Sequence, residues 1–106
     1  MMESGAYNPN WPDVHIGPEQ AVRAHKLLRG KSLMPIHWAM FNLGFHGWTE
    51  PIERIRAAAA KSDVTVMSPK LGQSFEPTRS PTFEKWWPEL PWQTAEQYPV
   101  KSSRVD

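Results

Sequence analysis

The sequence predicts an α/β protein in which two helices cover a small sheet. Two segments, 18–29 and 50–61, carry apolar residues at helical spacing. Each is followed by an apolar run of strand length. This order of helix, strand, helix and strand is typical of layered α/β domains. With 106 residues, of which 40% are hydrophobic, the chain suits one small domain at residues 1–77 and an irregular tail at residues 78–106.

The first helix is expected at residues 18–29. Pro18 suits the first helical position, where its missing N–H costs nothing, and Glu19 suits the positive helix end. Gly30 is expected to end the helix. Its apolar face is predicted to comprise Ala21, Val22, His25 and Leu28.

The second helix is expected at residues 50–61. Thr49 stands where a hydroxyl caps a helix N-terminus, and Pro51 follows in the first turn. The run RAAAAK has strong helix propensity. Its packed face is predicted to comprise Ile52, Ile55, Arg56 and Ala59.

The expected strands are short, and residues 1–17 read as a loop rich in turn formers. SLMPIHW (32–38) is one strand, in which Pro35 predicts a sheet edge or an irregular end. VTVMSP (64–69) is a second, and GQSFEP (72–77) is a candidate third. Because so thin a sheet leaves an open edge, we expect it to belong to a larger structure.

The tail shows no periodicity. Its aromatic residues fall between prolines, so we expect an irregular segment whose tryptophans pack on the rest of the chain or on a partner. These aromatic residues are Phe83, Trp86, Trp87, Trp92 and Tyr98.

Composition excludes several classes of function. Twelve basic and 11 acidic residues give a formal charge of +1, without the basic field that nucleic acid binding requires. The absence of cysteine excludes disulfides and thiolate chemistry. The sequence shows no secretory signal, apolar membrane span, nucleophile-elbow motif or phosphate-binding glycine loop, so the expected location is cytoplasmic.

The four histidines are candidate metal ligands, although no two have the close spacing of a local metal motif. His37 follows a strand, where side chains face a cleft in layered α/β proteins, or it packs between Trp38 and the first helix. His15 precedes a helix and faces either the same cleft or water. We expect His25 to pack within its helix and His46 to be solvated.

Four segments, GAYNPNW, VHIGPEQAVRAH, KSLMPIHWAMF and TEPIERIRAA, together resemble the C-terminal portion of metallo-β-lactamase-fold hydrolases. The branch is the one that includes N-acyl-phosphatidylethanolamine-hydrolysing phospholipase D and related bacterial enzymes, and the resemblance covers about residues 4–76. It implies the C-terminal half of a four-layer αββα sandwich with a zinc site, at which metal-activated water hydrolyses a phosphodiester or related ester.

The resemblance also implies site residues. His37, in the IHW segment, falls on the last metal ligand, and His15 falls on a catalytic histidine near the active site. Tyr7 and Trp11 would line the approach of a small-molecule or lipid-like substrate. The segment from Trp11 to His15 is shorter than in the phospholipase branch, so the resemblance does not carry lipid specificity.

The H-x-H-x-D-H motif that supplies most zinc ligands in this family is absent. We therefore expect the chain to bind zinc weakly and to be inactive alone, and its expected partner is the missing N-terminal half or a second copy. The alternative is a non-catalytic interaction module or dimerising remnant that uses the sheet edge and the tryptophan-rich tail.

Overall fold

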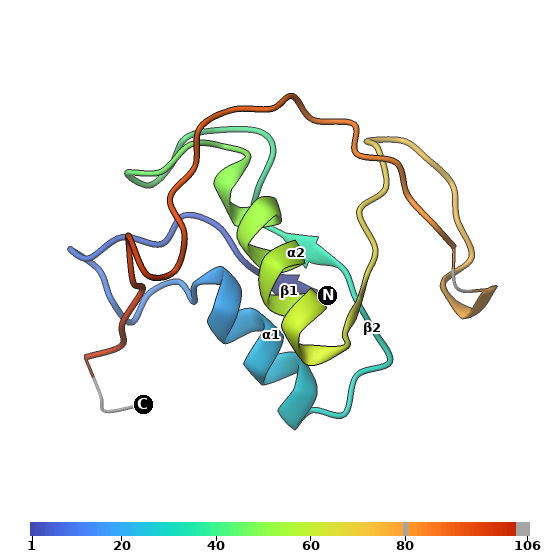
Figure 1. Cartoon of the computed structure of the whole chain (residues 1–106), viewed down its shortest axis with the longest axis horizontal. Helices are drawn as coiled ribbons and strands as arrows, with labels where there is room; N and C mark the ends of the chain where they lie inside the picture. Colours follow the sequence, from blue (N-terminus) through green and yellow to red (C-terminus); the bar gives the residue numbers. More distant parts are fainter. Residues whose placement is uncertain (80, 104–106) are drawn as a thin grey trace.

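The structure, a computed structural model, describes residues 1–79 and 81–103. Two helices lie side by side near the centre of the molecule, and long loops surround them (Figure 1). Within the described residues, no helix is long and apolar enough to cross a bilayer. The elements, in chain order, are β1 (Met2–Glu3), α1 (Pro18–Leu27), β2 (Ser32–Leu33), β3 (Pro35–Ile36), α2 (Glu50–Ser62), β4 (Thr65–Val66) and the 3-10 helix η1 (Pro77–Arg79).

The strands form two parallel pairs, β1 with β3 and β2 with β4. The carbonyls of Met34 and Ile36 accept hydrogen bonds from the β1 side, whereas the carbonyl of Leu33 accepts one from Met67 after β4. Because alternate backbone groups along a strand point to opposite sides, β1 and β4 flank the segment 32–36 on its two sides. The expected α/β class is confirmed, and the strand at β1 corrects the expectation of a loop throughout residues 1–17.

Pro35 lies in β3, which pairs only with β1 in a two-stranded sheet, so the other side of β3 is an open edge, which is one of the two expected placements. Its backbone faces the same side as Leu33, toward β4. Since proline has no N–H, the pairing with β4 cannot extend past this residue. Pro35 therefore also lies just past the end of the β2–β4 ladder, which agrees with the other expected placement, an irregular strand end.

Helix α1 ends two residues earlier than expected. Arg29 adopts the left-handed conformation, with φ 55°, and donates its N–H to Lys26, while Gly30 donates to His25. Glycine is needed at position 30 because the backbone there lies close to the His25 ring, and a Cβ would be only 2.3 Å from that ring. Leu28, expected on the packed face, follows the last helical residue and is 74% exposed.

Helix α2 begins and ends close to its predicted limits, but two of its details were wrong. Thr49 has helical dihedral angles, and its buried hydroxyl makes no capping bond and has no partner in the described residues. Arg56 is exposed, and Arg54 is buried in its place. The two helices and the strands enclose a core of Ala21, Val22, Leu33 and Ile55, which is flanked by Met2, Ile16, Ala58, Val64 and Val66.

The buried Arg54 links α2 to α1 and to the tail. Its guanidinium donates two hydrogen bonds of 2.8 Å to Glu19 and one of 3.0 Å to the Tyr98 carbonyl. Burial alone would lower the pKa of Arg54, but the hydrogen bonds and charge of Glu19 outweigh it and raise this pKa. Glu50, also buried, accepts hydrogen bonds from the Tyr7 hydroxyl and the Gln93 backbone.

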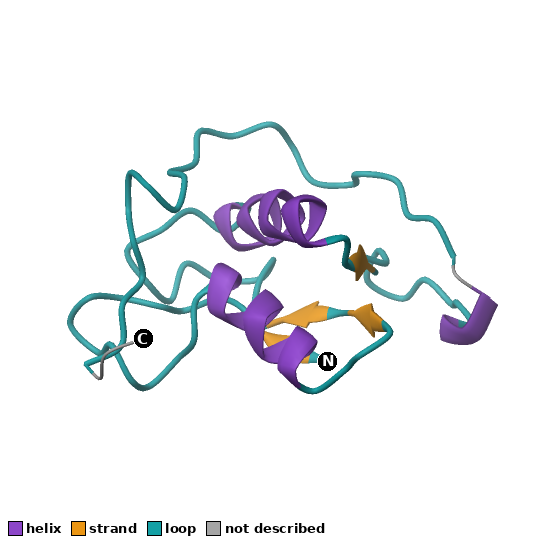
Figure 2. Ribbon diagram, turned by 60° about the horizontal axis from the view of Figure 1, so that its bottom comes forward, coloured by secondary structure: helices purple, strands orange, loops and turns teal. Residues whose placement is uncertain are grey.

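Beyond β4 the chain runs mainly as a loop, as expected for the tail, and contains η1 (Figure 2). The candidate strand at residues 72–77 is absent, because a turn at Gly72 and flanking prolines leave it no neighbour to pair with. Trp86 and Trp87 pack against Trp38, with ring centroids 5.3 Å from it in each case. Two of the tail's tryptophans therefore pack on the chain itself.

The C-terminal described residues return to the loop that follows β1 (Figure 1). Asp13 accepts hydrogen bonds from Ser102 and Ser103, and Gln20 donates to the Val100 carbonyl. The tail is thereby attached to both the N-terminal loop and α1.

Candidate metal centre

Three side chains from separate segments converge on one point. Oε2 of Glu3 lies 3.0 Å from Nδ1 of His15 and 3.1 Å from Nδ1 of His37. One potential ligand atom from each residue lies within 4.8 Å of the others. The two histidine rings meet edge to face, with centroids 5.7 Å apart. This set of two imidazoles and a carboxylate has the composition of a metal centre.

The parallel pairing of β1 and β3 explains this convergence. Glu3 is in register with Ile36, so Glu3 and the following His37 lie at the same carboxyl edge of the strands. Met2 packs on the core, which directs its neighbour Glu3 to the opposite face. His15 reaches this edge from the loop before α1.

The backbone around His37 is unusual in two respects. His37 has φ 64°, a left-handed conformation that costs a non-glycine residue about 1–2 kcal/mol. A Cβ on Gly5 would lie 1.8 Å from the His37 carbonyl oxygen, so only glycine fits beside it. Such conformations are concentrated at functional sites.

Glu3 is held on both of its oxygens. Oε1 accepts the Ile16 backbone N–H at 3.1 Å, and Oε2 faces the two histidines. Burial raises the pKa of Glu3, but the hydrogen bonds from His15 and Ile16 outweigh burial and lower it below its ordinary value. Glu3 is therefore an ionised acceptor at neutral pH.

A cavity of about 410 Å³ opens beside the two histidines. His15 and His37 form its polar part, and its other lining residues are Ala6, Trp38, Met40, Phe41 and Leu43. Met40, Phe41 and Leu43 are each more than 60% exposed. The cavity therefore combines two imidazoles with an open apolar wall.

The two predicted substrate-binding residues, Tyr7 and Trp11, are not among the residues that line this cavity. Tyr7 is fully buried, and this burial raises the pKa of its hydroxyl. The hydrogen bond from the hydroxyl to Glu50 raises the same pKa further. Trp11 donates its indole N–H to the carbonyl of Ala6, one of the lining residues. Their predicted role in substrate binding stays a prediction.

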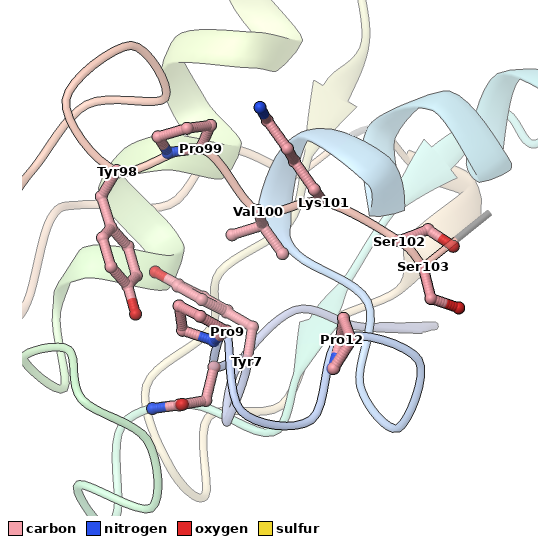
Figure 3. Close-up of a pocket in the computed structure, with 10 residues that line it drawn as sticks. Tyr7, Pro9, Pro12, Tyr98, Pro99, Val100, Lys101, Ser102 and Ser103 are labelled. Carbon is pink, nitrogen blue, oxygen red and sulfur yellow. The ribbon is translucent and has the colours of Figure 1, made fainter. Parts of the chain in front are cut away.

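Tyr7 borders a different cavity of about 330 Å³, between the N-terminal loop and the tail. Figure 3 shows Pro9 and Pro12 on one side of it and Tyr98, Pro99 and Val100 on the other.

The remaining histidines lie outside the cluster. His25 is buried in α1, as expected. His46 is half-buried rather than solvated, because its ring stacks on Tyr7 with centroids 4.0 Å apart.

Sequence reasoning missed Glu3, since no second carboxylate stands near it and its segment was read as a loop. The one signal was a charged residue two positions before Gly5 in an otherwise uncharged stretch. Its importance depends on pairing with a strand more than 30 residues away.

Comparison with known proteins adds distant partial relatives. Uncharacterized proteins of Mycobacterium bovis and Mycobacterium tuberculosis are each 44% identical over 90 residues, which cover 82% of this chain and 24% of theirs. N-acyl-phosphatidylethanolamine-hydrolyzing phospholipase D 1 of Caenorhabditis elegans is 30% identical over 79 residues, or 68% of this chain and 22% of that enzyme. The chain thus spans about a quarter of their length. No protein-family model and no solved structure matches it.

Proposed function

We propose that this chain is the C-terminal part of a zinc-dependent hydrolase of the metallo-β-lactamase fold, which cleaves a phosphodiester or related ester bond when complete. The observation that carries the proposal is the convergence of Glu3, His15 and His37 beside an apolar cavity. The partial similarity to a phospholipase D supports the same reaction class.

The donor set fits zinc. Imidazole nitrogen and carboxylate oxygen are both zinc ligands, and two imidazoles disfavour magnesium and calcium, which prefer oxygen. His37 would hold the metal, together with ligands from the rest of the protein. When bound, the ion polarises the scissile group and supplies an activated water at neutral pH.

The chain's own residues would perform the remaining tasks. His15, hydrogen-bonded to Glu3, would exchange a proton with the substrate. Met40, Phe41 and Leu43 would bind an apolar group of the substrate and exclude water from the polar end of the cavity. Trp11, whose indole N–H donates to the Ala6 carbonyl, would support the loop that carries Ala6.

A chimaera tests this proposal. This chain replaces the corresponding 90 residues of the Mycobacterium tuberculosis relative, and zinc content and hydrolysis of bis(p-nitrophenyl) phosphate are measured. We expect a folded chimaera that binds zinc and hydrolyses the ester, with both properties lost in His37→Ala and kept in the control His46→Gln. A folded chimaera whose zinc content does not depend on His37 would overturn the proposal.

A second function, a non-catalytic interaction module or dimerising remnant, is favoured by one observation. Met40, Phe41, Leu43 and Phe45 are all exposed within one six-residue segment. If this segment joins two copies, light scattering will detect a dimer that Phe41→Ser and Phe45→Ser convert to a monomer. A monomer at all concentrations, with no binding of a hydrophobic dye, excludes this second function.

A further inference from the structure

We propose that a pocket between α2, β4 and the tail binds the phosphoryl group of a small, soluble phosphate monoester, with Arg56, Lys85 and Ser68 as its polar contacts. The pocket has a volume of about 290 Å³ and shares no lining residue with the cavity beside the two histidines. This second binding site therefore goes beyond the proposed function and does not depend on it.

The pocket forms because the tail returns past the segment that follows β4 (Figure 1). The indole N–H of Trp86 donates a 3.0 Å hydrogen bond to the Ser68 carbonyl in that segment. The indole N–H of Trp87 donates a 2.7 Å hydrogen bond to Glu53 on α2. The tail is thus attached to both of the other walls, so the pocket is formed before any ligand binds.

Arg56 on α2 is the first group suited to an anion. It is exposed, and it makes no hydrogen bond or ion pair within residues 1–79 and 81–103. Its guanidinium lies over the ring of Trp87, 5.5 Å from the ring centroid. Stacking uses the face of a guanidinium and leaves its in-plane N–H groups free, and these are the groups that bind phosphate oxygens in pairs.

Lys85 places a second cation at the same pocket. Its ammonium lies 5.9 Å from the centroid of the Trp87 ring, and it pairs with Glu53 at 2.6 Å and with the exposed Glu89. Neither of these carboxylates lines the pocket. The lining residues therefore carry two cations and no anion, which favours an anionic ligand over a neutral or cationic one.

Ser68 supplies a buried hydroxyl that the fold itself does not use. The residue is only 8% exposed, and its hydroxyl makes no hydrogen bond within the described part of the chain. Buried hydroxyls in folded proteins usually have a partner, and this one belongs to a residue of the pocket wall. A serine hydroxyl can donate to a phosphate oxygen, and Thr65 and Thr82 add two further hydroxyls to the lining.

The apolar part of the lining defines the rest of the ligand. Phe83 and Trp87 contribute aromatic side chains, against which an apolar group of the ligand can pack. A volume of about 290 Å³ lies at the lower limit of small-molecule sites. We therefore expect a small monoester, in which one compact apolar group carries the phosphoryl group.

Proton–nitrogen NMR titration of the full chain tests the site, with phenyl phosphate as the probe. We expect saturable shifts of the Trp87 indole N–H and the Ser68 backbone N–H, and no such shifts with phenol, which has the ring without the phosphoryl group. Arg56→Gln should weaken binding by about tenfold, the effect of a charged hydrogen bond, and Ser68→Ala by about fivefold. Arg23→Gln, which removes an exposed cation from α1, is the matched control and should leave the affinity unchanged.

The absence of saturable shifts with phenyl phosphate, or equal shifts with phenol, would overturn the proposal. An affinity that neither Arg56→Gln nor Ser68→Ala reduces would also overturn it. Phosphatidic acid vesicles carry the same phosphoryl chemistry on a membrane, so sedimentation with them that depends on Arg56 would contradict a soluble ligand. The zinc content of the chimaera does not enter this test, and the proposed function can fail while the phosphate site stands.

Discussion

Replacing Arg54 with methionine tests whether the buried guanidinium holds the two helices and the tail together. The side chain is 0% exposed and donates three hydrogen bonds, two to Glu19 at 2.8 Å and one to the Tyr98 carbonyl at 3.0 Å. Methionine preserves much of the length but leaves the Tyr98 carbonyl unpaired and the buried Glu50 without its nearest cation, 3.6 Å away.

Removing one partner of a buried ion pair costs about 3–5 kcal/mol. Domains of this size have a free energy of unfolding of about 5–15 kcal/mol, so Arg54→Met should remove a large share of it. The melting temperature should fall by at least about 12 °C, at 4 °C for each kcal/mol. Urea unfolding followed by circular dichroism measures the free energy directly.

Arg23→Met is the control, because Arg23 is exposed on α1 and its loss should change the free energy of unfolding by less than about 0.5 kcal/mol. If Arg54→Met were destabilised by no more than this control, the buried guanidinium would not be an important link between the helices and the tail.

Two further predictions concern the metal centre. Gly5→Ala should destabilise the fold by about 3 kcal/mol, because its Cβ would overlap the His37 carbonyl. Gly47→Ala is the control: a Cβ at this position would have no atom within 4 Å, so the free energy of unfolding should not change in the same urea titration. Equal effects of the two substitutions would contradict the reasoning. The pKa of Glu3 is lowered in the folded state from an ordinary value of 4.5, so its stabilisation is complete above that pH and is lost as the pH falls through the folded-state pKa. Glu3→Gln should therefore show a smaller acid-induced loss of stability than the unmodified chain, and parallel curves would refute this assignment.

The sequence by itself determined the local structure. Helical periodicity and proline positions located both helices to within two residues, because these signals depend on neighbours within one or two turns. The sequence also predicted strands that include residues 32–36 and 65–66, and its prolines predicted an irregular tail. The resemblance singled out His15 and His37, which the structure brings together.

Only the tertiary structure decided which residues meet over long separations. Glu3 joins the histidines because β1 pairs with β3, and no local pattern predicts that pairing. Arg54 is buried in place of Arg56 because Glu19 and the Tyr98 carbonyl come from distant segments to satisfy its charge. In both cases the deciding free energy comes from partners that the chain brings together only when folded, which is why propensity and spacing could not show it.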